Sequence, residues 1–96
     1  MTEPSFEWDE AKNTINQSKH GASFYEAQHA FLDPRRVIAE DHAHSQKERR
    51  YYCFGSDSEG AGILTVRFTY RSTRIRIIGA DYWRKGKNNY EQANRI

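Results

Sequence analysis

Arginine side chains recur at alternating positions in two neighbouring segments of the second half of the chain. Residues 73–80 (TRIRIIGA) alternate with the period of a β-strand, and Arg74 and Arg76 fall on the face opposite the isoleucines. Residues 63–70 (ILTVRFTY) predict the preceding strand, with Arg67 on its outer face. Arginines on adjacent strands lie about 5–8 Å apart, and guanidinium groups bind phosphate oxygens in a bidentate manner. The spacing therefore favours a sheet face that binds the phosphates of RNA.

Aromatic residues lie among these arginines in the sequence. Unstacked bases stack on aromatic rings, which contributes about 1–3 kcal/mol per base, so this mixture favours single-stranded nucleic acid over a simple acidic protein. We expect Trp8 and Tyr82 to stack on bases, and Lys85 to bind RNA together with Arg67 and Arg74. The alternative is that the tyrosines are ordinary strand formers and that Trp8 is a buried anchor.

Two further groups of residues suit proton transfer or phosphate binding. Lys19 and His20 end a predicted helix, where the helix dipole favours cations. They suit a general acid or a phosphate contact, and simple capping of the helix is the alternative. Glu48 stands two positions before Arg50, and a carboxylate beside guanidinium groups stays ionised. Glu48 is therefore expected either to act as a general base on a ribose 2′-hydroxyl or only to orient Arg50.

The sequence offers little for metal or covalent chemistry. Asp41-His42-Ala43-His44 places two histidines near an acid, but no third and fourth ligand follow at a suitable spacing. We therefore expect no metal and no cofactor. Cys53 is the only cysteine, and because it lies in an aromatic strand we expect a buried thiol.

The remaining residue types, Arg, Lys, His, Glu and Tyr, suit metal-free cleavage of RNA. A base takes the 2′-hydroxyl proton, and the oxygen then attacks its own phosphate. Cations stabilise the added negative charge, and an acid protonates the leaving oxygen. DNA lacks the internal nucleophile, so this set of groups would spare it.

The charge of the chain is divided unevenly. The net charge is +2, yet residues 1–48 carry five Lys/Arg against nine Asp/Glu, and residues 49–96 carry ten against four. Such asymmetry indicates an anionic partner for the second half, although the two halves of a folded chain can also neutralise each other. No apolar run approaches the ~20 residues of a membrane span, and no secretory signal begins the chain. We expect a cytoplasmic protein with one domain, residues 1–96.

Two helices are predicted near the start of the chain. Asp9 is a suitable N-cap for the first helix, and Gly21 suits the left-handed position after its last turn. Ala11, Ile15 and either Ser18 or Lys19 follow as a stripe at helical spacing. The second helix begins with the capping box of Ser23 and Glu26. Its expected apolar stripe consists of Phe24, Ala27, Ala30 and Phe31.

Strands dominate the second half of the chain. Strands are predicted over residues 37–39, 50–54, 63–70 and 73–80, the last three linked by short turns as in an antiparallel meander. Residues 6–8 read as a short strand or an apolar anchor, and residues 84–93 as a C-terminal helix. The expected fold is therefore α+β, with two N-terminal helices, a small antiparallel sheet of three to four strands and a C-terminal helix.

Motifs along nearly the whole chain resemble those of BrnT-type toxins. They are FEWDEAKN (6–13), KHGASFYEA (19–27) with FLDP (31–34), Glu48-x-Arg50 followed by a glycine, and RIRIIGA (74–80). The resemblance implies a RelE-like fold and a bacterial toxin that cleaves RNA without a metal and stops translation. It also implies a BrnA-type antitoxin partner with a ribbon-helix-helix module, through which alone the complex contacts operator DNA. No membrane partner is expected.

The resemblance also assigns residues and exposes one departure. The residues at family motif positions are Trp8, Lys19, His20, Glu48, Arg50 and Arg76. The family usually continues its last strand as I-I-S-A-R, whereas this chain reads Ile-Ile-Gly-Ala followed by Asp81. Arg84 or Lys85 can supply the missing charge from the next turn. The expected function is a metal-independent endoribonuclease toxin, and the alternative is a catalytically degenerate module that binds RNA or antitoxin in transcriptional regulation.

Overall fold

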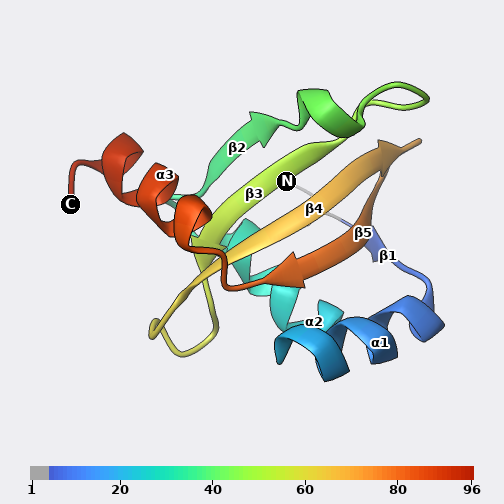
Figure 1. Cartoon of the computed structure of the whole chain (residues 1–96), viewed down its shortest axis with the longest axis horizontal. Helices are drawn as coiled ribbons and strands as arrows, with labels where there is room; N and C mark the ends of the chain where they lie inside the picture. The colour runs from blue at the N-terminus through green and yellow to red at the C-terminus, as the bar shows by residue number, and fades with distance from the viewer. Residues whose placement is uncertain (1–4) are drawn as a thin grey trace.

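A five-stranded mixed sheet organises the part of the chain that the structure, a computed structural model, describes, residues 5–96 (Figure 1). The strand order is β1-β5-β4-β3-β2. The strands are β1 (Ser5–Glu7), β2 (Val37–Glu40), β3 (Tyr51–Ser56), β4 (Ile63–Arg71) and β5 (Arg74–Asp81). Strands β2 to β5 pair antiparallel, as predicted, but β1 pairs parallel with β5. The expectation of three to four antiparallel strands is therefore incomplete. Residues 6–8 were predicted as a short strand or an apolar anchor, and β1 forms a strand at Ser5–Glu7 whose parallel pairing the sequence did not indicate.

Three α-helices and two short 3₁₀ segments complete the described residues. They are α1 (Glu10–His20), α2 (Phe24–Ala27), η1 (Gln28–Leu32), η2 (His42–His44) and α3 (Arg84–Asn94). The Asp9 carboxylate accepts hydrogen bonds from the first-turn amides of α1, and Gly21 adopts φ 69° after its last turn. Ser23 caps α2 through the amide of Glu26. The N-caps of both helices and the glycine that ends α1 are thus those predicted from the sequence. The second helix differs after Ala27, where it continues as the 3₁₀ segment η1.

The main core lies between one face of the sheet and the α2–η1 segment. The predicted apolar stripe of this segment, Phe24, Ala27, Ala30 and Phe31, is buried against Cys53, Leu64, Val66, Phe68 and Ile77. Gly55 lets the backbone of Ala30 approach the sheet, since a Cβ there would stand 2.8 Å from the Ala30 Cα. This close approach fixes η1 against β3.

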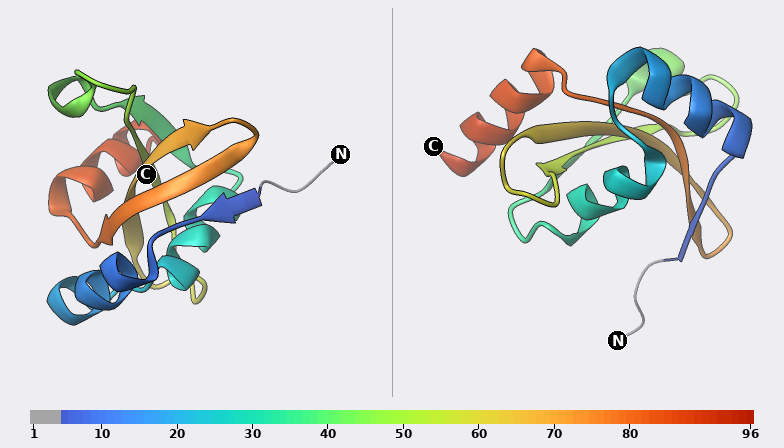
Figure 2. Two further views of the ribbon diagram at one scale, coloured as in Figure 1. Left: turned by 90° about the vertical axis from the view of Figure 1, so that its right-hand side faces the viewer. Right: turned by 90° about the horizontal axis from the view of Figure 1, so that it is seen from below.

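Helix α3 covers one end of the opposite face of the sheet (Figure 2). Gly86, which weakens the helix prediction on propensity alone, is buried at this contact. A Cβ at Gly86 would collide with the Thr65 hydroxyl and stand 2.9 Å from the Phe54 ring. Tyr90 holds the other end of α3, because its hydroxyl donates a 2.6 Å hydrogen bond to Asp33. We call this face of the sheet the α3-side face.

The buried side of α1 is polar, which corrects the expected stripe of Ala11 and Ile15. Both of these residues are exposed, and Asn13 and Asn16 are buried instead. The Asn16 side chain donates to the Ala80 carbonyl at 2.7 Å and accepts from the Ala80 amide at 3.2 Å. Asn13 accepts from the amide of Phe24 at 2.8 Å. Helix α1 therefore packs by hydrogen bonds to the edge of β5 rather than by an apolar stripe.

Candidate active site

The predicted arginines do share the α3-side face of the sheet. Arg71 lies opposite Arg74, Thr69 opposite Arg76, and Arg67 opposite Gly79 in the β4–β5 ladder. A β-bulge between Arg67 and Phe68 leaves Ile78 without a partner residue in this ladder. The bulge keeps the arginines of both strands on one face and turns Ile78 toward the β5 edge.

Arg74 and Arg76 both form ion pairs with Glu7, a residue that the sequence analysis did not single out. The Arg76 guanidinium donates to Glu7 at 3.0 Å, and the Arg74 guanidinium lies 3.8 Å from the same carboxylate. The parallel pairing of β1 with β5 places Glu7 directly opposite Arg76. The expectation of an open basic face at this edge is therefore corrected, because a carboxylate from β1 occupies it.

Arg50 and Arg67 border a hollow on the α3-side face, which we call the central hollow. Its volume is about 280 Å³. It is lined by Asn16, Asp41, His44, Arg50, Arg67, Ile78 and Gly79. Two guanidinium groups, one from the start of β3 and one from β4, thus border the same space.

A histidine held by a buried carboxylate completes the central hollow. His44 and Asp41 lie at the two ends of the η2 turn, and the His44 Nδ1 is 2.9 Å from the Asp41 carboxylate. Asp41 is 4% exposed, whereas the His44 side chain is open to solvent. Burial, followed by the charge and hydrogen bond of Asp41, raises the pKa of the Tyr52 phenol. With Nδ1 engaged by Asp41, Nε2 is the imidazole atom that is free to exchange a proton with a ligand.

The Arg67 guanidinium is held from two sides. A Cβ at Gly79 would stand 3.1 Å from the Arg67 Nε, so the side chain lies directly over the Gly79 backbone. Asp81 contacts the same guanidinium at 3.7 Å. Gly79 and Asp81, at which the strand differs from the pattern expected from the resemblance, therefore both contact Arg67. Glycine provides the space for the arginine, and aspartate provides its counter-charge.

Glu48 contacts two arginines and does not line the central hollow. Its carboxylate lies 3.6 Å from Arg50 and 3.8 Å from Arg71. The Arg50 Nε is buried and has no hydrogen-bond partner among residues 5–96. The placement of Glu48 favours the role of orienting Arg50 over that of a base within the hollow.

Lys19 and His20 border a second hollow that adjoins the central hollow. This space, the α1 hollow, has a volume of about 210 Å³ and is lined by Lys12, Ile15, Asn16, Lys19, His20 and Ile78. Asn16 and Ile78 line both the α1 hollow and the central hollow. The end of α1 thus brings two further basic side chains beside the central hollow. We call the series of adjoining hollows on this face the groove.

A third hollow extends the groove in the other direction. It has a volume of about 210 Å³ and is lined by Tyr52, Thr65, Arg67, Asp81 and Trp83, and we call it the Trp83 hollow. Arg67 lines both this hollow and the central hollow. Trp83, which the sequence analysis did not single out, borders the groove together with Tyr52.

Seven of the predicted RNA-binding or catalytic residues line none of the three hollows: Trp8, Glu48, Arg74, Arg76, Tyr82, Arg84 and Lys85. The Trp8 ring packs on Tyr25 and Phe24, with centroids 4.8 and 6.2 Å away. Tyr82 donates to Asp57 at 3.2 Å and borders a separate hollow together with Arg84. Lys85 lies 5.7 Å from the centroid of the Trp83 ring. Arg84 and Arg76 are thus not neighbours in one hollow.

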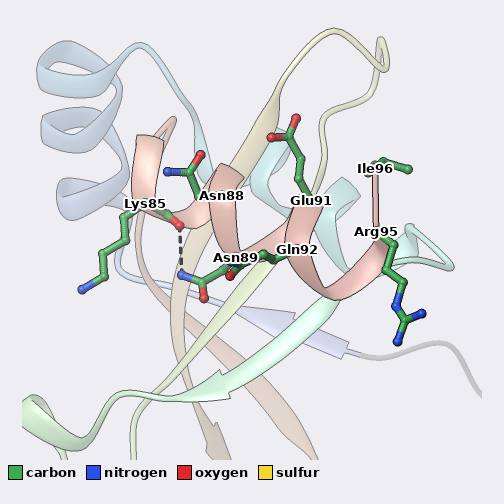
Figure 3. Close-up of a pocket in the computed structure, with 7 residues that line it drawn as sticks. All are labelled: Lys85, Asn88, Asn89, Glu91, Gln92, Arg95 and Ile96. Atoms are coloured by element: carbon green, nitrogen blue, oxygen red, sulfur yellow. Dashed lines mark hydrogen bonds between the residues drawn. The ribbon is translucent and has the colours of Figure 1, made fainter.

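Another hollow lies along the outer side of α3 (Figure 3). It has a volume of about 700 Å³ and is lined by Lys85, Asn88, Asn89, Glu91, Gln92, Arg95 and Ile96. Figure 3 shows the Lys85 and Arg95 side chains pointing apart at the two ends of the helix. This shallow surface lacks the convergent polar groups that mark an active site.

The Asp41–His44 pair was weighed only as a metal ligand set in the sequence, and its i, i+3 spacing was the available signal for an acid–base pair. Within residues 5–96, no group of three or more His, Cys, Asp or Glu side chains is placed to hold a metal ion. In the same part of the chain, no helix has the length and apolar composition needed to cross a membrane.

Comparison with known proteins supplies a family for the chain. The sequence model of the family described as "Ribonuclease toxin, BrnT, of type II toxin-antitoxin system" matches residues 8–86. This range contains the central, α1 and Trp83 hollows with all their lining residues. No curated protein matches the chain.

Proposed function

The chain belongs to the BrnT family of ribonuclease toxins of type II toxin-antitoxin systems, and from this premise we propose that it is a metal-independent endoribonuclease. In this proposal it cuts RNA in the central hollow and so inhibits translation. The observation that supports this proposal most strongly is that Arg50, Arg67 and His44 line one hollow, with His44 bound to the Asp41 carboxylate. These are the group types that metal-free phosphodiester cleavage requires.

Each group has a role set by its position. Arg50 and Arg67 bind the scissile phosphate and stabilise the charge of its transition state. His44 takes the 2′-hydroxyl proton through Nε2, and Asp41 fixes the orientation of the imidazole through Nδ1. The 2′-oxygen forms a bond to phosphorus, the bond to the 5′-oxygen breaks, and Lys19 or His20 at the adjoining α1 hollow protonates that oxygen. The products are a 2′,3′-cyclic phosphate and a free 5′-hydroxyl.

Other residues of the sequence hypothesis take supporting roles in this proposal. Glu48 orients Arg50, and Arg76 and Arg74 provide positive charge at the β1 edge while Glu7 holds them. Arg67 supplies the cation that Arg84 was expected to supply, since Arg84 borders a different hollow.

The proposal is tested by exchanging the two histidines of the η2 turn separately. His44→Ala should lower the cleavage rate in excess EDTA by about 10²–10⁴-fold, as expected for loss of a general acid or base. The matched control is His42→Ala, because the His42 side chain is 85% exposed and lies near Glu40 rather than in the hollow. Equal cleavage by wild type and His44→Ala would refute the assignment of His44.

The family membership implies an antitoxin partner, and we propose a BrnA-type protein that covers the α3-side face. An acidic segment would compete with RNA for the same arginines, and operator DNA would be bound through the antitoxin alone. The expected result is that the purified complex does not cleave RNA and that Arg76 is protected in it. A complex that leaves Arg76 fully exposed contradicts this arrangement.

One observation favours a second candidate function, that of a binding module without cleavage. Glu7, Glu48 and Asp81 together contact all five arginines of the face at 3.0–3.8 Å, so the positive field over the groove is reduced. RNA affinity that falls steeply with salt, without any product under conditions where the protein is folded, would establish this alternative.

A further inference from the structure

We propose that the Trp83 hollow binds one RNA base beside the scissile phosphate and that it prefers guanine. This inference rests on the proposed function, since it assumes that the phosphate lies at Arg67. It goes beyond that function because it assigns a base-binding site and a preference among bases.

The Trp83 hollow lies next to the central hollow because the two share Arg67 as a lining residue. Arg67 borders the central hollow on one side and the Trp83 hollow on the other. A phosphate bound by Arg67 therefore places the base of an adjoining nucleotide at Trp83. The volume of about 210 Å³ is that of a small site, suited to one flat ring system rather than to a longer segment.

The aromatic wall of the hollow is exposed and yet fixed. Trp83 is the N-cap residue of α3 and is 37% exposed. Its ring packs on Tyr52 with centroids 5.8 Å apart, and Tyr52 in turn stacks on Phe54 at 5.6 Å. A ring held in this way loses little conformational entropy when a base stacks on it. The Lys85 ammonium, 5.7 Å from the Trp83 centroid, adds positive charge for the adjoining backbone.

The polar groups of the hollow determine which base fits. The Asp81 side chain is 23% exposed, and its contact with Arg67 is a loose 3.7 Å, which leaves acceptor positions free. An ionised carboxylate only accepts hydrogen bonds, so it favours a base edge that presents neighbouring N–H donors. Guanine presents two such donors, N1–H and the N2 amino group. Thr65 also lines the hollow, but its hydroxyl is buried against Gly86 and takes no part in the contact with the base.

A carboxylate in a groove for RNA repels phosphate, so the presence of Asp81 calls for a role that offsets this cost. If Asp81 served only to position Arg67, its removal would lower the affinity of all nucleotides equally. If it reads the base, its removal changes the ratio of affinities between guanine and the other bases. The ratio therefore separates the two roles.

The test uses tryptophan fluorescence and four probes, the 3′-monophosphates of guanosine, adenosine, cytidine and uridine. Trp8→Phe leaves Trp83 as the sole tryptophan, and Trp83→Phe is the matched variant that leaves Trp8. We expect saturable quenching in Trp8→Phe, with guanosine 3′-monophosphate bound about tenfold or more tightly than the uridine compound. Asp81→Asn in the same background should remove this advantage, and Glu91→Gln on the outer side of α3 should not.

Three results would overturn the inference. They are absence of saturable quenching at millimolar nucleotide, equal affinity for all four probes, and an unchanged guanosine advantage in Asp81→Asn. Because nucleotide binding is measured without cleavage, these results do not depend on catalysis. Loss of cleavage on His44→Ala with no base preference would retain the proposed function and reject the base site. A base preference without cleavage by the wild type would retain the base site and reject the proposed function.

Discussion

Replacing Arg67 by alanine removes the guanidinium that connects two hollows, and its consequences can be worked from the structure. The Arg67–Asp81 contact is 3.7 Å long, and the Arg67 side chain is 41% exposed. An ion pair this exposed contributes about 0.2–1 kcal/mol to stability. For a domain of this size, that corresponds to a fall of at most about 4–8 °C in melting temperature.

The expected catalytic loss is much larger than the loss of stability. Removing one preorganised donor from a site of developing charge costs about 2.7–4 kcal/mol, or 10²–10³-fold in rate. A protein with a typical stability of about 5–15 kcal/mol stays almost entirely folded after losing about 1 kcal/mol. A slower Arg67→Ala enzyme would therefore have lost transition-state stabilisation rather than its fold.

The assay is single-turnover cleavage of a labelled RNA in excess EDTA, accompanied by thermal unfolding of each variant. Arg49→Ala is the matched control, because Arg49 is 75% exposed, contacts Glu40 at 3.8 Å and borders none of the three hollows of the groove. We expect Arg49→Ala to cleave at the rate of the wild type. A rate for Arg67→Ala within threefold of that of Arg49→Ala would refute the role assigned to Arg67.

Three further predictions concern the scaffold. Gly86→Ala should destabilise the protein by about 1–3 kcal/mol, measured by urea unfolding, because its Cβ would overlap the Thr65 hydroxyl; a stability equal to that of the wild type would contradict the close contact of α3. Burial opposes ionisation of Asp33, but hydrogen bonds from Tyr90 and backbone amides outweigh it and lower the Asp33 pKa from 3.8. The folded-state value is thus below the unfolded one, so this stabilisation is present above pH ~4 and is lost as the pH falls through the lowered folded pKa; Asp33→Asn should flatten the decline of stability in acid, and an unchanged decline would argue against it. Burial raises the pKa of the Cys53 thiol to about 12, so a thiol reagent at pH ~8 should label it only after denaturant is added, and rapid labelling of the native protein would show that β3 opens.

The local signals of the sequence predicted the elements well where one interaction decided the outcome. Caps at Asp9 and Ser23 depend on a side chain and a backbone amide two or three residues apart, and both formed. The alternation of β4 and β5 depends on one buried face, and it placed Arg67 and Arg76 on the same side. These features follow from neighbours in the chain and need no knowledge of the tertiary fold.

The features that the sequence did not reveal depend on residues far apart in the chain. Glu7 accepts a hydrogen bond from Arg76, which lies 69 residues away in the sequence. Asn16 forms a hydrogen bond with the backbone of Ala80 in β5, 64 residues away. The basic face predicted from one segment therefore has acidic partners that come from other segments. The buried side of α1 was predicted wrongly because its side chains bind backbone groups of other elements. His44 was undervalued because the burial of Asp41, which makes the pair useful, is set by the strands around it.

The central claim, metal-free cleavage by an internal 2′-oxygen, is tested most directly with an RNA that carries one deoxynucleotide. The cleavage position is first mapped in excess EDTA, and the nucleotide on its 5′ side is then replaced by its 2′-deoxy form. The account predicts that the unmodified RNA is cut to a 2′,3′-cyclic phosphate, and that the modified RNA is not cut at that position. Cleavage of the modified RNA at the same position, or cleavage only when Mg²⁺ is added, would contradict it.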